Sequence, residues 1–213
     1  EGFELLDYNN LVDLENKFKE NSNIVSFMFE PIQGEAGVII PDYGYLKGVR
    51  ELCNKYNVLM IADEVQTGLS RTGKLLACDY EEIKPDLLIL GKALSGGYYP
   101  ISCVLGNKEI MDAVDPGTHG STYGGNPLAC SIASTALDVV IDEKLDINSH
   151  KQGIVFRHEI NKIKKDFISD IRGKGLLNAI ECVDDKYTQK LHDELLKNSV
   201  ITKIAHGNKL RIS

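Results

Sequence analysis

Two short apolar runs constrain the fold of this chain more than any other feature. They span residues 58–62 (VLMIA) and 87–90 (LLIL), and each has the length and continuous apolar character of a strand buried in a parallel sheet. Asp63 follows the first run directly, and Lys92 follows the second after a single glycine. Because ligands bind at the carboxyl ends of strands in open α/β sheets, the sequence predicts a carboxylate and an amine that face one pocket.

The composition excludes several classes of function. The chain carries 31 Asp and Glu against 24 Lys and Arg, a formal net charge of −7 that argues against a nucleic-acid surface. No apolar run approaches the ~18 residues of a membrane-spanning helix, so no membrane partner is expected. The five cysteines form no C-x-x-C pair and the five histidines lack ligand spacing, so we expect free thiols and no metal site.

The order of the expected elements indicates an α/β unit followed by a smaller α+β unit. Periodicity predicts helices at 11–19, 43–56, 109–113 and 128–141, and apolar runs predict further strands at 24–29 and 101–105. From about residue 145, helices at 151–165 and 186–198 flank strands at 171–180 and 201–204. We therefore expect a large domain over residues 1–127, a connecting helix over 128–144, and a small α+β domain over 145–213.

Residues 68–74 (GLSRTGK) match the G-x-x-x-x-G-K spacing of a nucleotide-binding phosphate loop. The next residue is Leu75 rather than Ser or Thr, so the magnesium ligand of that motif is missing. The strand that ends in Asp63 also feeds the loop almost directly, whereas a phosphate loop follows its own strand and opens a helix. Nucleotide binding is therefore disfavoured.

The residue types at the sheet edge favour pyridoxal 5'-phosphate (PLP) chemistry. We expect Lys92 to be partly desolvated, which lowers the pKa of its amine and makes it nucleophilic toward carbonyl groups. A nearby carboxylate such as Asp63 suits a protonated pyridine nitrogen. Residues 119–127 (HGSTYGGNP) are rich in glycine and hydroxyl groups, a composition suited to binding a phosphate.

Five segments, in matching order, resemble the class III PLP-dependent aminotransferases: EPIQGEAGV (30–38), IADEVQTGLSRTGK (61–74), PDLLILGKALSGG (85–97), HGSTYGGNPLAC (119–130) and RGKGLLNAIE (172–181). The resemblance implies the α/β fold type I of PLP enzymes, with a mostly parallel mixed sheet between helices and a small α+β domain. GEAGV, GKALSGGYYP and GSTYGGNP are most similar to the ornithine branch. That branch transfers the δ-amino group of L-ornithine to 2-oxoglutarate, giving glutamate 5-semialdehyde and glutamate. An acetylornithine or 4-aminobutyrate type is the nearest alternative, followed by a non-catalytic relative.

The resemblance also assigns roles around the cofactor. Lys92 matches the Schiff-base lysine, which doubles as the general base. Asp63 matches the partner of the pyridinium nitrogen, Gln66 lies near the phenolic oxygen, and Val65 packs on one ring face. Thr122, with Ser121, matches the hydroxyl that reaches the phosphate of a neighbouring subunit.

Substrate recognition and assembly follow from the same resemblance. Glu35 and Arg211 match a pair in which Glu35 masks the arginine from ornithine and releases it to bind the carboxylate of the 2-oxo acid. Shared phosphate binding implies a homodimer or a higher oligomer, acting on small amino acids and 2-oxo acids. The family's N-terminal third has no counterpart here, so we expect part of a longer protein, located in the cytoplasm or alternatively in the mitochondrial matrix.

Overall fold

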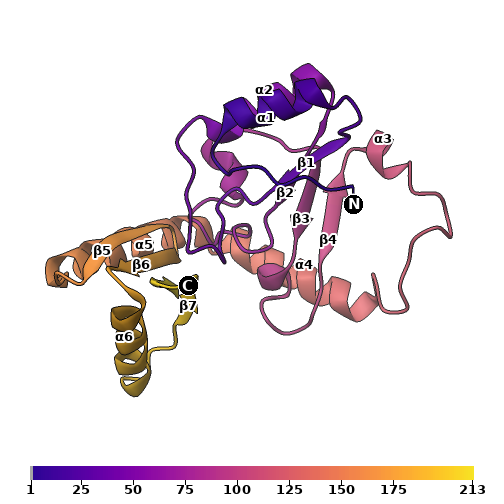
Figure 1. Cartoon of the computed structure of the whole chain (residues 1–213). Helices are drawn as coiled ribbons and strands as arrows, with labels where there is room; N and C mark the ends of the chain where they lie inside the picture. Colours follow the sequence, from indigo (N-terminus) through magenta and orange to yellow (C-terminus); the bar gives the residue numbers. More distant parts are fainter. Residues whose placement is uncertain (1) are drawn as a thin grey trace.

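The computed structural model describes residues 2–213 and shows two separate sheets, each with its own helices (Figure 1). The first sheet has the order β1 (Ser26–Phe29), β2 (Leu59–Asp63), β3 (Leu87–Leu90) and β4 (Cys103–Gly106). β1, β2 and β3 are parallel, and β4 pairs antiparallel with β3. The prediction of a mixed, mostly parallel sheet in an α/β unit is therefore confirmed.

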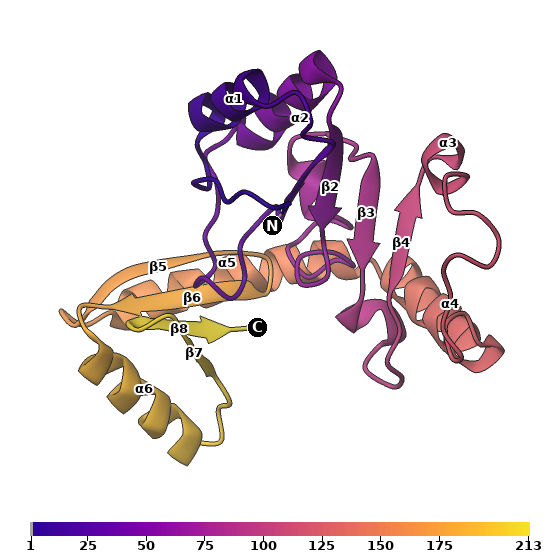
Figure 2. The ribbon, with the colours of Figure 1, turned by 45° about the vertical axis from the view of Figure 1, so that its right-hand side comes forward.

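Helices α1 (Leu11–Glu20) and α2 (Tyr45–Tyr56) lie side by side over the first sheet (Figure 2). Asn10 caps α1 by accepting a hydrogen bond from the Asp13 N–H at 3.1 Å, which satisfies one of the unpaired donors at the helix start. Val49 and Cys53 of α2, one helical turn apart, are fully buried in the same cluster as Met60 of β2. This cluster is the larger core of the first unit.

The chain after β3 forms η2 (Lys92–Ser95), β4, the short helix α3 (Lys108–Met111) and the long helix α4 (Pro127–Asp142). Asn126 caps α4 through a 3.0 Å hydrogen bond from the Ala129 N–H, and Pro127 occupies the first turn, where its missing N–H costs nothing. Leu94 of η2 packs in one cluster with Ala133 and Leu137 of α4. Helix α4 therefore packs against η2 and supports it.

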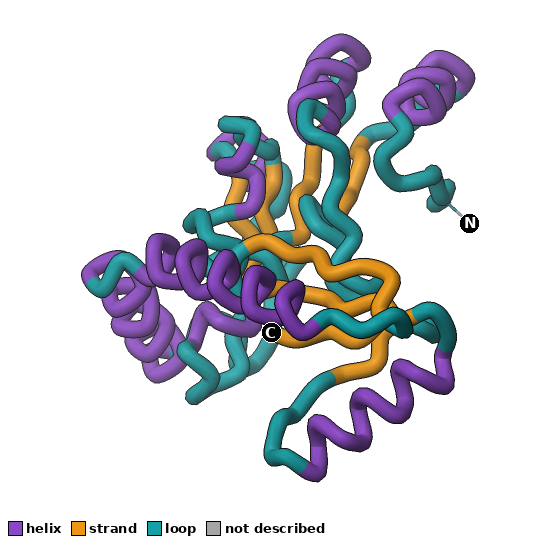
Figure 3. The backbone as a smooth tube through the Cα atoms, turned by 90° about the vertical axis from the view of Figure 1, so that its left-hand side faces the viewer, coloured by secondary structure: helices purple, strands orange, loops and turns teal. Residues whose placement is uncertain are grey.

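The second sheet is antiparallel, with the order β5 (Ile168–Lys174), β6 (Leu177–Cys182), β8 (Lys209–Ile212) and β7 (Lys203–Ala205) (Figure 3). Helices α5 (Leu145–Ile163) and α6 (Asp185–Lys197) pack on it, since Ile160, Leu191 and Leu195 share a core with Ile180 and Leu210. The smaller α+β unit is thus present, and whether the domain boundaries lie at 127 and 144 stays a prediction.

The structure corrects one predicted strand, at 171–180, and the start of one predicted helix, at 151–165. Residues 171–180 form a hairpin rather than a single strand, because the chain reverses between β5 and β6 at Gly175, whose φ of +52° favours glycine. The expected helix at 151–165 also begins earlier, at Leu145. Both errors come from segments in which apolar spacing alone does not mark where a turn falls.

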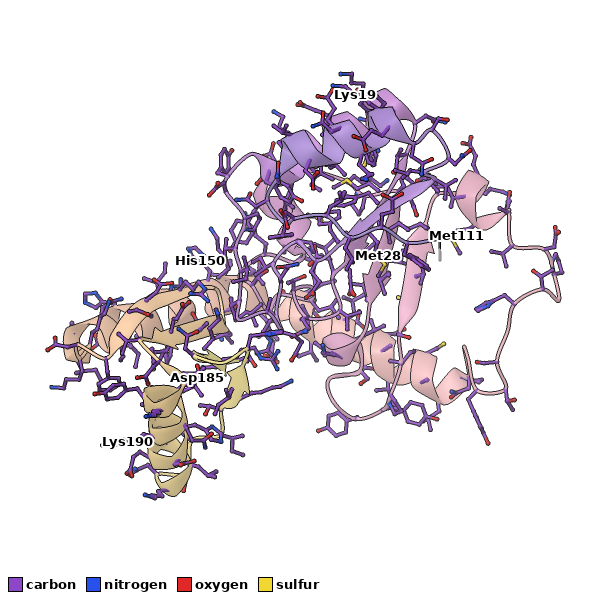
Figure 4. The ribbon with its side chains drawn as sticks, viewed as in Figure 1. Lys19, Met28, Met111, His150, Asp185 and Lys190 are labelled. Atoms are coloured by element: carbon purple, nitrogen blue, oxygen red, sulfur yellow. The ribbon has the colours of Figure 1, made fainter. Side chains whose placement is uncertain are left out.

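The two units meet through loops that follow the strands of the first sheet. Ile32 and Val38 pack with Leu177 and Ala179 of β6 in a small apolar cluster. Close by, the loop through Gly73 approaches α5 so tightly that a Cβ there would lie 3.1 Å from the Cα of His150, which Figure 4 labels at the junction. The edge of the first sheet is therefore held against the second unit.

Candidate active site

Asp63 and Lys92 lie at the same edge of the first sheet. Asp63 is paired with Ile89 in the β2–β3 register, and the Glu64 N–H donates to the Ile89 carbonyl at 3.0 Å. Lys92 begins η2 two residues after β3 ends. The structure thus brings together the two residues that the sequence places at strand ends.

The backbone at Lys92 is unusual. Its φ is +43°, in the left-handed region that residues other than glycine rarely adopt. Gly91 precedes it as the N-cap of η2, and Gly96 ends η2 in a left-handed conformation. Because strained backbone clusters at functional sites, this conformation is an independent indication that Lys92 has a specific role.

A hollow of about 700 Å³ opens beside Lys92. Its lining comes from the β2–β3 edge, the segment before β4, and the loop before α4: Val65, Gly91, Lys92, Tyr99, Pro100, Ile101, Ser102, Tyr123, Gly124, Gly125, Asn126 and Ala129. Val65 covers the backbone next to the lysine, since a Cβ on Gly91 would lie 3.4 Å from Val65 Cγ1. The hollow therefore joins the lysine to an apolar side chain and to the glycine-rich loop.

Lys92 itself is exposed, so the expectation that it is partly desolvated is wrong for the described chain. In the apolar run that precedes it, Leu90 is buried and Leu87, Leu88 and Ile89 are half-buried, whereas Lys92 lies beyond the strand, at the start of η2. Burial of a residue just after a strand depends on what covers the sheet edge, and the strand sequence does not carry that information.

The carboxylate of Asp63 is oriented by its own turn. Its Oδ1 accepts a hydrogen bond from the Val65 N–H at 3.0 Å, and the side chain is half-buried. No group within residues 2–213 donates a hydrogen bond to the other oxygen, Oδ2, which leaves it able to accept from a ligand. A fixed carboxylate, an amine and an apolar side chain along one edge fit a protonated pyridine ring that carries an aldehyde.

Ser121 and Thr122 do not line this hollow, although the residues that follow them in the same loop do. Both are exposed on the long loop between α3 and α4, which swings away from the rest of the first unit (Figure 1). Ser121 Oγ accepts a hydrogen bond from the Gly124 N–H at 2.9 Å and so shapes the turn that does line the hollow. Their predicted contact with a phosphate stays a prediction.

Glu35 and Arg211 form the ion pair that was expected of them. Arg211 Nη1 donates to Glu35 Oε1, and the two residues come from different units of the fold. Gln66 bridges the pair, donating from Nε2 to Glu35 Oε1 at 3.3 Å and accepting from Arg211 Nη1 at 3.0 Å. Gln66 is held here by close packing on Gly34, where a Cβ would lie 2.6 Å from its Oε1.

Lys203 is a member of this cluster that the sequence interpretation missed. Its Nζ lies 2.5 Å from Glu35 Oε2, the carboxylate oxygen opposite the one that Arg211 occupies. Lys203 of β7 is also the direct cross-strand partner of Arg211 of β8. The short HGN turn between these strands could have revealed this register, because it places 203 and 211 opposite each other on the same face.

The two cations change the ionisation of Glu35. Hydrogen bonds from Lys203 and then Arg211 lower the pKa of the Glu35 carboxyl from its ordinary 4.5 to about 2. Since the Glu35 side chain is 50% exposed, solvent weakens the energetic value of these pairs. Glu35 is therefore fully ionised near neutral pH and open to displacement.

Glu64 is a second residue whose importance the sequence did not reveal. It is 1% exposed, and its carboxylate accepts from the Ala77 N–H at 2.9 Å, the Cys78 N–H at 2.8 Å and the Thr67 hydroxyl. Together these bonds close residues 64–78 into a compact loop. The segment that resembles a phosphate loop is therefore a scaffold that fixes Val65 and Gln66.

Arg172 holds the loop that carries Glu35. It donates from Nε to the Val38 carbonyl at 3.0 Å and from Nη2 to the Gly37 carbonyl at 2.6 Å, and its Nη1 pairs with Asp170 and Glu181 at 2.7 Å each. Val38 has a φ of +56°, which is rare for a β-branched residue and is stabilised by these bonds. The Glu35 loop is thus anchored on β5.

Other classes of site find no support in the part of the chain that is described. Residues 2–213 contain no cluster of three or more metal-ligating side chains, and their five cysteines are free thiols. Across the same range, every helix is too short or too polar to cross a bilayer.

Comparison with known proteins identifies the family. The profile of the family described as aminotransferase class-III matches residues 6–213. The ornithine aminotransferase, mitochondrial, of Drosophila melanogaster is 55% identical over 213 residues, covering 100% of this chain and 49% of that protein.

Two solved structures are similar over almost the whole chain. An ornithine aminotransferase from Toxoplasma gondii superposes with a TM-score of 0.95 at 47% identity, covering 100% of this chain and 50% of that one. It was crystallised with oxidised glutathione and is described as having partial occupancy of PLP at the active site. An acetylornithine aminotransferase from Elizabethkingia anophelis superposes with a TM-score of 0.94 at 54% identity, covering 98% of this chain and 53% of that one.

The chain spans about half the length of the relatives it matches, 49% of the Drosophila protein. Both the family profile, over residues 6–213, and the level of identity exceed what a shared fold alone would give. The segments that carry the match include both sheets and the edge on which Asp63 and Lys92 lie. This chain belongs to the class III aminotransferases, a family of PLP-dependent transferases.

Proposed function

We propose that the protein to which this chain belongs transfers the δ-amino group of L-ornithine to 2-oxoglutarate, giving glutamate 5-semialdehyde and glutamate. The observation that carries the proposal is the placement of Asp63 and Lys92 at one sheet edge beside a hollow of about 700 Å³. The names of the Drosophila and Toxoplasma relatives support ornithine as the amino donor.

PLP is the cofactor that we propose for this site. Lys92 would hold it covalently, and the Asp63 carboxylate would hold a proton on the ring nitrogen through its free oxygen. Val65 would lie against one face of the ring, and Gln66 would donate toward the phenolic oxygen. When bound, the cofactor supplies an electron-accepting pyridinium ring.

The chain's own residues account for the proton transfer and the order of the two half-reactions. Lys92 Nζ removes a proton from ornithine Cδ, the carbon that carries the distal amine. While Glu35 is paired with Arg211, the guanidinium is not free to attract the α-carboxylate of an amino acid to the reacting position. When 2-oxoglutarate enters, its carboxylate replaces Glu35 on Arg211 and aligns the keto group.

The nearest alternative is another ω-aminotransferase of the same family. It is favoured by one observation, the 54% identity to the acetylornithine aminotransferase of E. anophelis. N-acetylornithine has the same δ-amine and α-carboxylate as ornithine, but its α-amine is acetylated. Reaction of the full-length protein with ornithine and with N-acetylornithine, each alone, separates the two.

A shared active site is part of the proposal. Ser121 and Thr122 are exposed on the loop before α4 and do not line the hollow of their own chain, a position from which they could reach the phosphate site of a second subunit. We therefore propose a homodimer, located in the cytoplasm. The mitochondrial matrix is the alternative, and the name of the Drosophila relative supports it.

An absorbance scan of the full-length protein tests the proposal. After addition of PLP we expect a band near ~420 nm that is absent from Lys92→Ala and that disappears on addition of ornithine without 2-oxoglutarate. Failure of the wild-type protein to develop the band would overturn the assignment of PLP chemistry. A band that responds to N-acetylornithine and not to ornithine would move the assignment to the acetylornithine branch.

A further inference from the structure

Lys203 and Arg211 hold one carboxylate from opposite sides. Lys203 Nζ lies 2.5 Å from Glu35 Oε2, while Arg211 Nη1 pairs with Oε1. The two cations are direct neighbours across the β7–β8 pair, and like charges in that position repel each other. Glu35 lies between them and compensates both.

When Arg211 is released, the negative charge of Glu35 loses its partner, and the Glu35–Arg211 pair by itself offers no other cation to compensate it. Glu35 has to leave Arg211 just as a substrate carboxylate arrives, so two negative groups compete for one guanidinium. Without another cation, Glu35 would be unpaired beside a second anion. Its return to Arg211 would then oppose binding of the 2-oxo acid.

We propose that Lys203 is a positioning residue that keeps Glu35 paired after Arg211 is released, and so favours binding of the 2-oxo acid; this inference rests on the proposed Glu35–Arg211 exchange. The geometry suits the role, because Lys203 pairs with Glu35 Oε2 whereas Arg211 pairs with Oε1. Glu35 can rotate away from Arg211 without breaking its bond to Lys203.

The exposed fractions of the Arg211, Glu35 and Lys203 side chains agree with a fixed Arg211 and a mobile Glu35–Lys203 pair. The Arg211 side chain is 15% exposed and is fixed further by Gln66, so it offers a rigid donor for an incoming carboxylate. The Glu35 and Lys203 side chains are 50% and 56% exposed, so both can move into solvent together. Lys203 is also the largest cause of the lowered pKa of Glu35, ahead of Arg211.

The test uses the full-length, PLP-loaded protein and two readouts. One is the equilibrium affinity for glutarate, a dicarboxylate without a keto group, measured by calorimetry. The other is KM for 2-oxoglutarate and for ornithine. For Lys203→Met we expect glutarate binding to weaken and KM for 2-oxoglutarate to rise by roughly threefold to fivefold, the size typical of a partly exposed ion pair. KM for ornithine should change by less than about twofold, within the error of such a comparison.

Matched variants separate this role from a structural one. Lys203→Arg keeps the cation and should restore glutarate affinity, and Lys203→Gln serves if the Met variant folds poorly. Lys190→Met removes one lysine from the exposed surface of α6, where Figure 4 labels it, and should leave the affinity unchanged. In the Glu35→Gln background, Lys203→Met should have no further effect, because the residue through which it acts is already neutral.

Two results would overturn the proposal. Tighter glutarate binding in Lys203→Met would mean that Lys203 holds Glu35 on Arg211 rather than drawing it away. Weaker binding in both the wild-type and the Glu35→Gln background would mean that Lys203 contacts the dicarboxylate directly. If ornithine is not a substrate, the proposed function fails, but the glutarate measurements still decide the role of Lys203.

Discussion

The two halves of the candidate site are built to different degrees within this chain. Around Arg211, Glu35, Gln66 and Lys203 form a connected set of hydrogen bonds that spans both units. Around Lys92, the side chain is exposed at an open hollow, and the neighbouring loop at Ser121 and Thr122 is exposed as well. The carboxylate-recognition half is therefore preorganised by the chain itself, whereas the half that we assign to the cofactor needs further groups to enclose it.

The largest expected effect lies in the open half. Lys92→Ala in the full-length protein should lower kcat by roughly 10²–10⁴-fold, the range lost with a positioned general base. A steady-state assay with ornithine and 2-oxoglutarate measures this loss of kcat. Added methylamine, an amine that can replace the missing lysine side chain, should restore part of the rate. Lys74→Ala, a change to an exposed lysine in the loop that resembles a phosphate loop, should leave kcat unchanged. Loss of activity in that control would contradict a scaffold role for the loop.

The next effect concerns stability inside the smaller unit, where α5 packs against the turn between β5 and β6. A Cβ on Gly153 would lie 1.9 Å from the Gly175 carbonyl oxygen, so Gly153→Ala should destabilise the protein by about 1–3 kcal/mol, as overpacking does. Urea unfolding of the full-length protein measures this loss. Gly120→Ala, in the open half, meets no atom within 4 Å and should stay within about 0.5 kcal/mol of the wild type. Equal losses in the two variants would refute this difference in packing between the two positions.

A smaller effect is expected at the ion pair. Glu35→Gln frees Arg211 to bind α-carboxylates, so the rate with an α-amino acid such as glutamate should rise relative to ornithine by about tenfold, equivalent to ~1.4 kcal/mol. Single-substrate reactions followed by absorbance give the ratio. An unchanged ratio would show that the Glu35–Arg211 pair is only structural.

The smallest effect is a pH dependence. Because the Glu35 pKa is lowered from 4.5 to about 2 by Lys203 and Arg211, its contribution to stability is present above pH 4.5 and is lost as the pH falls toward 2. The difference in unfolding midpoint between the wild type and Glu35→Gln should therefore be constant from about pH 7 to 5 and shrink below that range. A difference that grows on acidification would be inconsistent with this sign.

Strand ends were the most predictable part of the site. Asp63 and Lys92 could be placed from the sequence because each follows a short, continuous apolar run, and parallel strands deliver their carboxyl ends to one edge. The helices at 11–20, 45–56 and 127–142 were also located to within two residues, because their apolar spacing is regular.

Features that depend on long-range packing were not predictable in the same way. Lys203 lies on a three-residue strand with too few positions to show a period, and its importance comes from the register with Arg211. Glu64 looks like any charged residue after a strand, although it is buried by N–H groups 13 and 14 positions further on. The exposure of Lys92 depends on which groups cover the hollow, not on its local sequence.

The anchoring of the Glu35 loop by Arg172 affects how the two sheets can move relative to each other. The loop leaves β1 of the first sheet, yet its carbonyls at Gly37 and Val38 are bound by a side chain of β5, and its apolar residues pack on β6. The loop that carries Glu35 is therefore held by the smaller unit, while Glu35 itself is also bonded to Gln66 of the first unit. A hinge rotation of one sheet against the other would therefore have to break the hydrogen bonds of Gln66 to Glu35 and Arg211 before it could change the distance between these residues and Lys92.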